Sequence, residues 1–174
     1  FYENSPAAKA VFDLADNIRP GTGEQCFTAG KEELADTANT QPCLYTVNLA
    51  AAEALKERGI RPEALAGFSL GELSALAYAG SMSCAEGLRL TVKRGRLMAD
   101  EAGRFPGAMA AVIGLSANEV GELCRETEGF SPANYNAPGQ TVVSGLRDAL
   151  PAFRQAAAAR GGRVLPLNVS GAFH

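Results

Sequence analysis

Residues 107–127 read GAMAAVIGLSANEVGELCRET, and they predict a β-strand followed by an α-helix. The apolar run from Ala108 to Leu115 is short, which favours a strand. Ser116 and Glu119 then have the spacing that opens a helix, and we expect this helix to continue to about Thr127. The strand and helix are the first two elements of a longer pattern.

That pattern continues to residue 169. We expect strands over 130–136 and 140–145 joined at Pro138-Gly139, a helix over about 147–160 ended by Gly161-Gly162, and a last strand over 163–169. The resulting β-α-β-β-α-β order is the split βαβ, or ferredoxin-like, arrangement. Residues 106–169 are therefore predicted to form a small ferredoxin-like subdomain.

The preceding part of the chain is mostly helical. Ser5-Pro6 is expected to open a helix to about Leu14, and residues 19–30 are rich in turn-forming residues. After a short helix near 31–36, further helices are expected over about 39–58, 70–78 and 85–101, with a short strand over 62–66. The apolar stripe predicted for helix 39–58 consists of Leu44, Val47, Ala51 and Leu55. One strand among helices indicates part of an α/β layer structure.

Composition narrows the classes of function. The 174 residues carry a net charge of −3, whereas nucleic-acid-binding domains are normally basic, so we expect no nucleic-acid partner. No apolar run approaches the roughly 18 residues of a membrane span, and the first residues lack a signal-peptide pattern. The four cysteines form no CxxC pair and the single histidine is His174, so we expect reduced thiols, no metal site and a cytoplasmic protein.

The segment GFSLG, residues 67–71, has the GxSxG pattern between a predicted strand and a predicted helix. This is the pattern of a nucleophile elbow, in which a serine lies on a sharp turn and flanking glycines remove Cβ atoms that would clash. Ser69 is the predicted nucleophile, and the backbone N–H of Leu70 is the predicted oxyanion donor at the helix start. Ser69 and Glu72 also have the spacing of a capping box, which is the structural alternative.

A serine nucleophile needs a base, and His174 is the only histidine. The order of serine before histidine is that of α/β-hydrolase sites, and His174 follows a predicted strand. Asp100 and Asp148 lie in helical stretches, so neither is placed to orient the imidazole. We therefore expect a Ser–His dyad, with a backbone carbonyl that holds the imidazole. The alternative is a terminal histidine without a catalytic role.

Arg94 differs from the other basic residues of its predicted helix. Those residues share one stripe and are Arg89, Lys93 and Arg96. Arg94 is expected to point away from them, toward the apolar residues Leu90, Leu97 and Met98. An arginine in such a place is rarely buried without a partner. It forms an internal ion pair, extends its apolar stem so that the guanidinium reaches solvent, or acts as a bidentate clamp for a substrate carboxylate.

Three amides are further candidates. Gln41 lies at a helix start and is expected to face inward, over Leu44 and Tyr45. Asn134 and Asn136 are expected at the end of a strand before a turn, where most asparagines bond their own turn.

Six segments together resemble the malonyl-CoA:acyl carrier protein transacylase family, which includes the acyltransferase domains of fatty-acid and polyketide synthases. They are NTQP (39–42), GFSLGELSALAYAG (67–80), KRGRLM (93–98), GAMAAVIGL (107–115), NYNAPGQTVVSG (134–145) and VSGAFH (169–174). They follow the family's order over most of the chain. The resemblance implies a partial α/β-hydrolase-like core over 1–105, an inserted ferredoxin-like subdomain over 106–169, and a return to the core at 170–174.

The resemblance also implies roles for individual residues. Ser69 would be the nucleophile, His174 the base and Arg94 the partner of the malonyl carboxylate. The implied substrate-binding residues besides Arg94 are Gln41, Leu70, Phe173, Asn134 and Asn136. The final GAFH is similar to the HAFH form of the family, which goes with malonyl rather than methylmalonyl. Two positions depart from the family pattern, because Phe68 and Gly171 each stand where the family has histidine.

The family also begins with a strand and a GQGxQ loop that supplies a second oxyanion donor, and it continues past the catalytic histidine. Neither part is in this sequence, so the resemblance implies an internal segment of a longer enzyme.

The implied activity is transfer of malonyl from malonyl-CoA to the phosphopantetheine thiol of acyl carrier protein through a malonyl-serine ester, in fatty-acid or polyketide biosynthesis. The resemblance implies no cofactor besides these substrates, no membrane partner and a monomer. Two alternatives remain open, namely a serine esterase or thioesterase with the same elbow and an inactive truncated fragment.

Overall fold

The computed structural model describes residues 2–169 and 171–174. The chain forms two compact units, residues 1–97 and 98–174, and helix α5 (Cys84–Arg104) contributes to both. Ser170, part of the predicted VSGAFH segment, lies outside the described residues. None of the described helices is long and apolar enough to cross a membrane.

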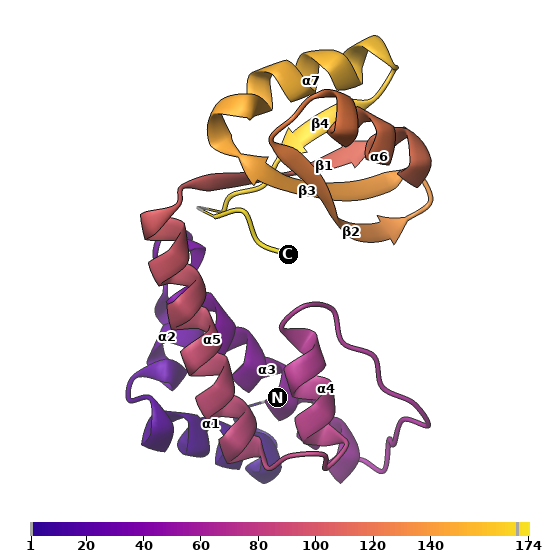
Figure 1. The fold of residues 1–174 in the computed structure, drawn as a ribbon. Coiled ribbons are helices and arrows are strands. Elements are labelled where there is room, and N and C mark those ends of the chain that lie inside the picture. The colour runs from indigo at the N-terminus through magenta and orange to yellow at the C-terminus, as the bar shows by residue number, and fades with distance from the viewer. Residues whose placement is uncertain (1, 170) are drawn as a thin grey trace. The chain divides into compact units, whose positions relative to one another are not determined.

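The first unit is built from helices (Figure 1). They are α1 (Pro6–Ile18), α2 (Thr22–Thr28), the 3-10 helix η1 (Glu33–Ala35), α3 (Thr37–Glu57), α4 (Gly71–Tyr78) and the first part of α5. Helix α1 begins as predicted, because the Ser5 side chain accepts a hydrogen bond from the Ala8 N–H and Pro6 is the first helical residue.

Two predictions for the region after Leu14 are wrong. Helix α1 continues to Ile18, and the expected turn region contains helix α2. Gly21, with a φ of 83°, supplies the left-handed turn between the two helices. The Gly23 N–H donates to the Asp16 carboxylate at 2.9 Å, a contact between neighbouring helices that short-range turn propensity does not reveal.

The buried face of α3 also differs from the predicted stripe. Leu44 and Leu55 are 49% and 46% exposed, whereas Tyr45 and Leu49 are each 1% exposed. Tyr45 and Leu49 pack with Phe12 of α1 and Leu88 of α5 in the core of this unit. The Tyr45 hydroxyl donates to the Cys84 carbonyl at 3.0 Å, so the interior holds the aromatic ring and also satisfies its polar group.

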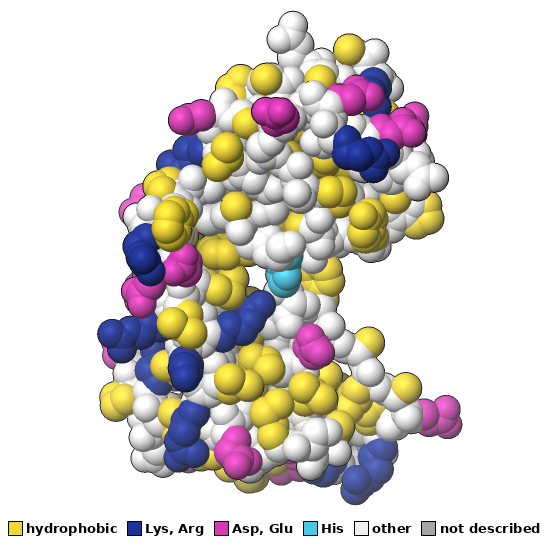
Figure 2. All heavy atoms as spheres, in the orientation of Figure 1, with side chains coloured by type: hydrophobic (Ala, Val, Ile, Leu, Met, Phe, Trp, Pro, Cys, Tyr) yellow, Lys and Arg dark blue, Asp and Glu magenta, His cyan; other side chains and the backbone are white. Residues whose placement is uncertain are grey.

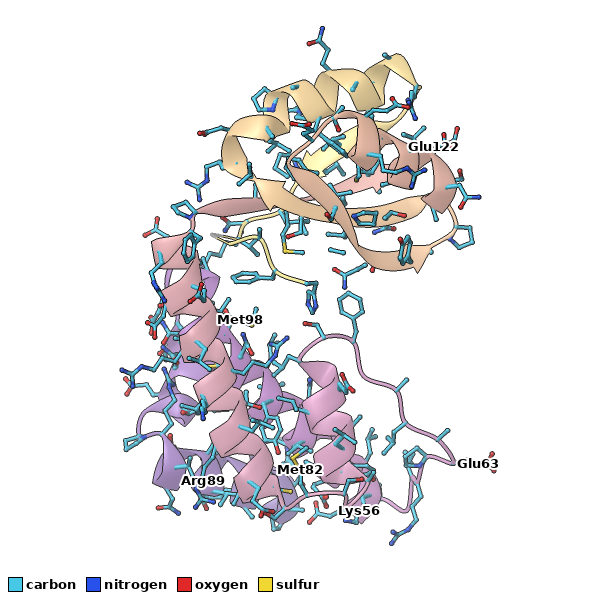
Figure 3. All side chains as sticks on the ribbon, viewed as in Figure 1. Lys56, Glu63, Met82, Arg89, Met98 and Glu122 are labelled. Carbon is cyan, nitrogen blue, oxygen red and sulfur yellow. The ribbon has the colours of Figure 1, made fainter. Side chains whose placement is uncertain are left out.

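The strand predicted over 62–66 does not form. Residues 58–68 are all exposed, and Glu63 lies at the outermost point of this loop in Figure 3. A strand needs a neighbour that pairs with its backbone N–H and C=O groups. In the part of the chain that the structure describes, no strand pairs with this loop, since the four sheet strands all belong to the second unit.

The second unit contains a four-stranded antiparallel sheet in the order β2-β3-β1-β4. Its strands are β1 (Gly107–Ile113), β2 (Phe130–Ala137), β3 (Gln140–Leu146) and β4 (Arg163–Pro166). Helix α6 (Ala117–Glu126) follows β1, and helix α7 (Leu150–Ala159) follows β3 after the 3-10 helix η2 (Arg147–Ala149). The element order is the predicted one, although β4 ends before the expected residue 169. Figure 1 shows α6 and α7 over the same face of the sheet.

Strand β1 is buried on both faces of this sheet. Ala110 and Val112 pack with Leu123 of α6 and Phe153 of α7 in the larger core. The intervening residues face the other way, and Met109 and Ala111 pack there with Val142, Val169 and Phe173. The period of two along a strand thus gives β1 two apolar faces.

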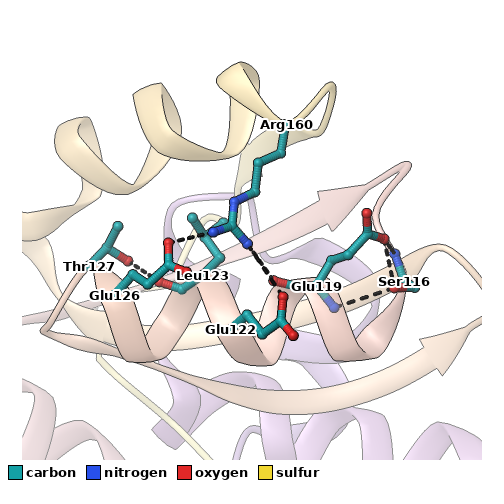
Figure 4. Close-up of polar contacts among 7 residues, drawn as sticks. All are labelled: Ser116, Glu119, Glu122, Leu123, Glu126, Thr127 and Arg160. Atoms are coloured by element: carbon teal, nitrogen blue, oxygen red, sulfur yellow. Dashed lines mark hydrogen bonds and ion pairs between the residues drawn. The ribbon is translucent and has the colours of Figure 1, made fainter.

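The start of α6 is held by the predicted spacing of Ser116 and Glu119. The Ser116 side chain accepts from the Glu119 N–H at 3.3 Å, and the Ser116 N–H donates to the Glu119 carboxylate at 2.7 Å (Figure 4). The Ser116 hydroxyl also donates to the Glu119 carboxylate at 2.6 Å. This bond, followed by the one from the Ser116 N–H, holds the pKa of Glu119 below its usual 4.5. At the other end of α6, Arg160 binds the Glu126 carboxylate (Figure 4).

Candidate functional site

Ser69 lies in a strained turn in the first unit. Its φ is 52°, in the left-handed region that side-chain-bearing residues rarely occupy. The Gly71 N–H donates to the Phe68 carbonyl at 2.8 Å and the Glu72 N–H donates to the Ser69 carbonyl at 3.3 Å, which closes the turn into α4. Such strain is concentrated at functional sites, and it is the geometry expected of a nucleophile elbow.

The two glycines of the GxSxG segment differ in whether their position has room for a Cβ atom. A Cβ atom on Gly67 would overlap backbone atoms of Gly71 and Glu72, so only glycine fits there. A Cβ atom on Gly71 would meet no atom within 4 Å in the part of the chain that the structure describes. The predicted steric role is therefore confirmed for Gly67 and is wrong for Gly71.

Leu70 is the residue that directly precedes α4, so its backbone N–H lies at the start of this helix. Within residues 2–169 and 171–174, this N–H donates to no acceptor. Its neighbours Gly71, Glu72 and Leu73 all donate within the turn. Leu70 thus offers a free donor next to Ser69 at the positive end of a helix.

Arg94 joins Ser69 to Gln41. Its Nη1 donates to Gln41 Oε1 at 2.5 Å and its Nη2 donates to Ser69 Oγ at 3.3 Å. Gln41 is 5% exposed, so it faces inward as predicted. The structure therefore brings together three residues that lie far apart in the sequence, on α3, the elbow and α5.

The predicted surroundings of Arg94 need a correction. Leu90 and Leu97 are 47% and 54% exposed, so they do not form an apolar pocket around the guanidinium. Arg94 instead contacts the polar groups of Gln41 and Ser69 and is half-buried. Its separation from the basic stripe is confirmed, because the three residues of that stripe are exposed, namely Arg89, Lys93 and Arg96.

A close approach of two helices places Arg94 beside Gln41. A Cβ atom on Gly95 would lie 2.6 Å from the Thr37 carbonyl oxygen, so α5 can lie this close to the start of α3 only with glycine there. The Thr37 hydroxyl donates to the Gly95 carbonyl at 2.9 Å and fixes the contact. Gly95 directly follows Arg94, and Gln41 lies one helical turn after Thr37.

A hollow of about 440 Å³ lies beside the elbow. It is lined by Leu44 and Asn48 of α3, by Phe68 in the loop, and by Ser74 of α4, among others. Asn48 Nδ2 donates to Ser74 Oγ at 3.5 Å. Figure 2 shows hydrophobic side chains gathered on the visible face of this unit around α4 and the preceding loop.

Asn48 and Ser74 were not among the candidate site residues predicted from the sequence. A signal was present, since Gln41, Leu44 and Asn48 have the i, i+3, i+7 spacing of one helical face.

The remaining predicted residues belong to the second unit. Asn134 lies within β2 and pairs with Val142 rather than at a strand end, and Asn136 is exposed. Phe173 packs on the sheet face formed by Met109, Ala111 and Val142. His174 is exposed and has a φ of 63°.

Two glycines allow the last residues to pack on the second unit. Pro106 and Gly171 form an isolated antiparallel bridge. A Cβ atom on Gly171 would lie 2.7 Å from the Phe173 ring, and one on Gly107 would lie 2.6 Å from the Ala172 Cβ atom. A histidine at position 171, the family residue, would therefore need a different arrangement here. The Ser69–His174 dyad joins residues of the two units and stays a prediction.

The arrangement in the first unit suits chemistry at Ser69. A hydroxyl on a strained turn, a free backbone N–H and a guanidinium together can bind an acyl group that carries a negative charge. No group of His, Cys, Asp and Glu residues in the described ranges could hold a metal ion.

Comparisons with known proteins identify the family of the chain. The family model described as "Acyl transferase domain" matches residues 1–174. The malonyl CoA-acyl carrier protein transacylase of Bacillus subtilis is 40% identical over 179 residues, which cover 99% of this chain and 56% of that protein. The protein of the same name from Staphylococcus aureus (strain COL) is 37% identical and is covered over 58% of its length.

Two solved structures show the same similarity. The malonyl CoA-acyl carrier protein transacylase from Clostridium perfringens matches with a TM-score of 0.91 and 35% identity, over 99% of this chain and 56% of that one. A malonyl-transacylase in complex with a type II polyketide synthase acyl-carrier protein matches with a TM-score of 0.91 and 34% identity, over 98% and 57%. The chain thus spans little more than half the length of the curated relatives it matches.

Proposed function

This chain belongs to the acyl transferase family over its whole length, and on that premise we propose that the protein transfers malonyl from malonyl-CoA to the phosphopantetheine thiol of acyl carrier protein. The observation that carries the proposal is the pair of hydrogen bonds from Arg94 to Ser69 Oγ and Gln41 Oε1. They hold a cation that can bind a carboxylate beside a strained serine. A neutral acyl group would not need this cation.

The first half-reaction uses these groups in turn. Arg94 binds the malonyl carboxylate, and Ser69 Oγ attacks the thioester carbonyl while His174 accepts the serine proton. The Leu70 N–H stabilises the oxyanion of the tetrahedral intermediate. The C–S bond then breaks, and CoA leaves with the proton returned by His174.

The second half-reaction reverses these steps with another thiol. The pantetheine thiol gives its proton to His174 and attacks the malonyl-serine ester, and Ser69 leaves with the proton. The carrier protein departs as its malonyl thioester. Relatives are named for transfer to acyl carrier protein, and one solved relative is bound to such a carrier, which supports this choice of acceptor.

The finer features are proposals of the same kind. We propose an α/β-hydrolase-like core over 1–105 and 170–174 with the ferredoxin-like subdomain over 106–169, for which the sheet order and element order of the second unit are the support. Gln41, Asn134, Asn136 and Phe173 are proposed to contact substrate. We also propose that the protein is a cytoplasmic monomer and that it uses no cofactor beyond its two substrates.

Covalent labelling tests the proposed function. The protein used has a chain as long as those of its relatives, and it is incubated with malonyl-CoA labelled in the malonyl group. We expect label on the protein, its transfer to added holo-acyl carrier protein, and complete loss of label in Ser69→Ala.

Ser74→Ala is the matched control, because Ser74 lines the same hollow but is not the proposed nucleophile. It should retain labelling. Label on the Ser69→Ala protein would show that the nucleophile is another residue. Loss of label from the serine to water without transfer would instead support an esterase.

A further inference from the structure

Cys26 and Cys43 contact each other in the first unit, although 17 positions separate them in the sequence. Cys26 Sγ, on α2, donates to the carbonyl oxygen of Cys43, on α3, at 3.7 Å. Both cysteines are free thiols, and the proposed transfer reaction uses neither of them.

A polar network surrounds Cys43. The Cys43 thiol donates to Gln25 Oε1 at 3.5 Å, and the same oxygen accepts from Arg19 Nη1 at 2.8 Å. Arg19 Nη2 also donates to Asn39 at 2.8 Å, so the guanidinium is held in place beside the thiol. A fixed cation near a thiol favours the thiolate, which is the reactive form.

The two thiols differ in pKa, and Cys43 is the more acidic of the two. The pKa of Cys43 lies below the usual value for a thiol, mainly because of its interaction with the Cys26 side chain. Arg19 lowers the pKa of Cys43 further, while burial and Glu33 oppose these effects. The same contact with Cys43, together with burial, raises the pKa of Cys26. Cys43 is therefore the nucleophile of the pair.

Burial favours a small reactant at this pair. Cys43 is only 5% exposed, which disfavours attack on a bulky disulfide such as oxidised glutathione. A polar hollow of about 260 Å³ is lined by Arg19, Gln25 and Glu33, and Gln25 is the residue that accepts from the Cys43 thiol. A small polar oxidant such as a peroxide fits both observations.

We propose that Cys26 and Cys43 form a site of reversible oxidation, in which hydrogen peroxide converts the two thiols into a disulfide. The Cys43 thiolate attacks one peroxide oxygen, the O–O bond breaks, and Cys43 becomes a sulfenic acid while hydroxide leaves and is protonated to water. Cys26 then attacks the Cys43 sulfur, loses its proton, and displaces the hydroxyl as a second water. One peroxide is reduced by two electrons, and the two thiols are oxidised by two.

The site lies close to the proposed active site along α3. Gln41, which accepts the hydrogen bond from Arg94, is two residues before Cys43. The modification thus acts on the helical turn that holds Arg94, although the thiol chemistry does not depend on the proposed transfer reaction.

Thiol mapping of the folded protein tests the proposal. The folded protein is treated with stoichiometric hydrogen peroxide and then unfolded in urea, the remaining thiols are blocked with N-ethylmaleimide, and the peptides are identified by mass spectrometry. We expect a cross-linked peptide pair containing Cys26 and Cys43, reversed by dithiothreitol. Cys84 and Cys124 are internal controls and should be blocked as free thiols, since burial raises the pKa of both, that of Cys124 to about 11.

A variant and an unfolded control make the test decisive. In Cys26→Ser the sulfenic acid on Cys43 has no partner, so dimedone should label Cys43 and no cross-link should form. In urea the preference for this pair should disappear. Blocking of Cys26 and Cys43 to the same extent as Cys84 after peroxide would overturn the proposal, as would sulfinic acid on Cys43 with Cys26 still free. If Cys26→Ser does not fold, the presence or absence of the cross-link in the wild-type protein decides the test.

Discussion

Arg94 and Gln41 are joined by a hydrogen bond of 2.5 Å between residues separated by 53 positions in the sequence. Gln41 has no charge, so it orients the guanidinium without neutralising it. The second terminal nitrogen of Arg94 reaches Ser69 Oγ at 3.3 Å. The cation therefore lies beside the proposed nucleophile and keeps its charge, as the proposed contact with a substrate carboxylate requires.

Replacing Arg94 by alanine should separate carboxylated from neutral substrates. Charge-assisted hydrogen bonds in a desolvated site are worth about 2–5 kcal/mol, so kcat/KM for malonyl-CoA should fall steeply. Acetyl-CoA has no carboxylate, and its kcat/KM should be unchanged or higher. Arg94→Lys should also be impaired with malonyl-CoA, because an ammonium does not form the same two contacts.

The control for Arg94 is Arg89→Ala, an exposed position on the same helix, which should leave both values of kcat/KM unchanged. A proportional loss for both substrates in Arg94→Ala would show that Arg94 supports the fold and not the carboxylate.

Gly67→Ala should disrupt the elbow, because its Cβ atom would overlap the backbone of Gly71 and Glu72. We expect a lower melting temperature and loss of acyl-enzyme formation. The matched variant Gly71→Ala places its Cβ atom in open space at the first residue of α4, so it should keep the melting temperature. Equal melting temperatures for the two variants would contradict the steric explanation.

Gly107→Ala should displace the last residues of the chain from the second unit. Its Cβ atom would lie 2.6 Å from the Ala172 Cβ atom, which is too close for the present packing. Amide hydrogen exchange of Ala172 and Phe173 should become faster, as measured by NMR. Gly103→Ala is the control, since its Cβ atom meets nothing within 4 Å and it lies in helix α5, where alanine should stabilise by about 1 kcal/mol. Unchanged exchange in Gly107→Ala would show that the segment does not pack there.

Ser116→Ala should destabilise the second unit by about 1 kcal/mol at neutral pH, as is typical when a helix loses its N-terminal cap. The folded-state pKa of Glu119 is lowered below 4.5, so its contribution is present above the unfolded pKa and is lost as the pH falls through the folded pKa. Urea unfolding should thus show a difference between wild type and variant that shrinks as the pH falls below about 4.5. A difference that does not change with pH would assign the effect to the serine alone.

The sequence alone was sufficient to predict the order of helices and strands in the second unit and to single out Ser69 as the candidate nucleophile. These elements are encoded by neighbouring residues: Ser116 and Glu119 form the cap of α6, and Gly139 makes the turn between β2 and β3. Ser69 was predicted from the GxSxG pattern, in which the missing Cβ atom of Gly67 is a local requirement. Such features depend on a few adjacent residues, and a pattern in the sequence therefore reports them.

Tertiary structure decided the features that depend on distant residues. Tyr45 rather than Leu44 is buried because the interior of the first unit offers the Cys84 carbonyl to its hydroxyl. The segment before Gly67 is a loop in the described chain because a strand exists only when a second strand pairs with it. Arg94 meets Gln41 because Gly95 lets two helices approach, and local sequence does not specify the distance between two helices.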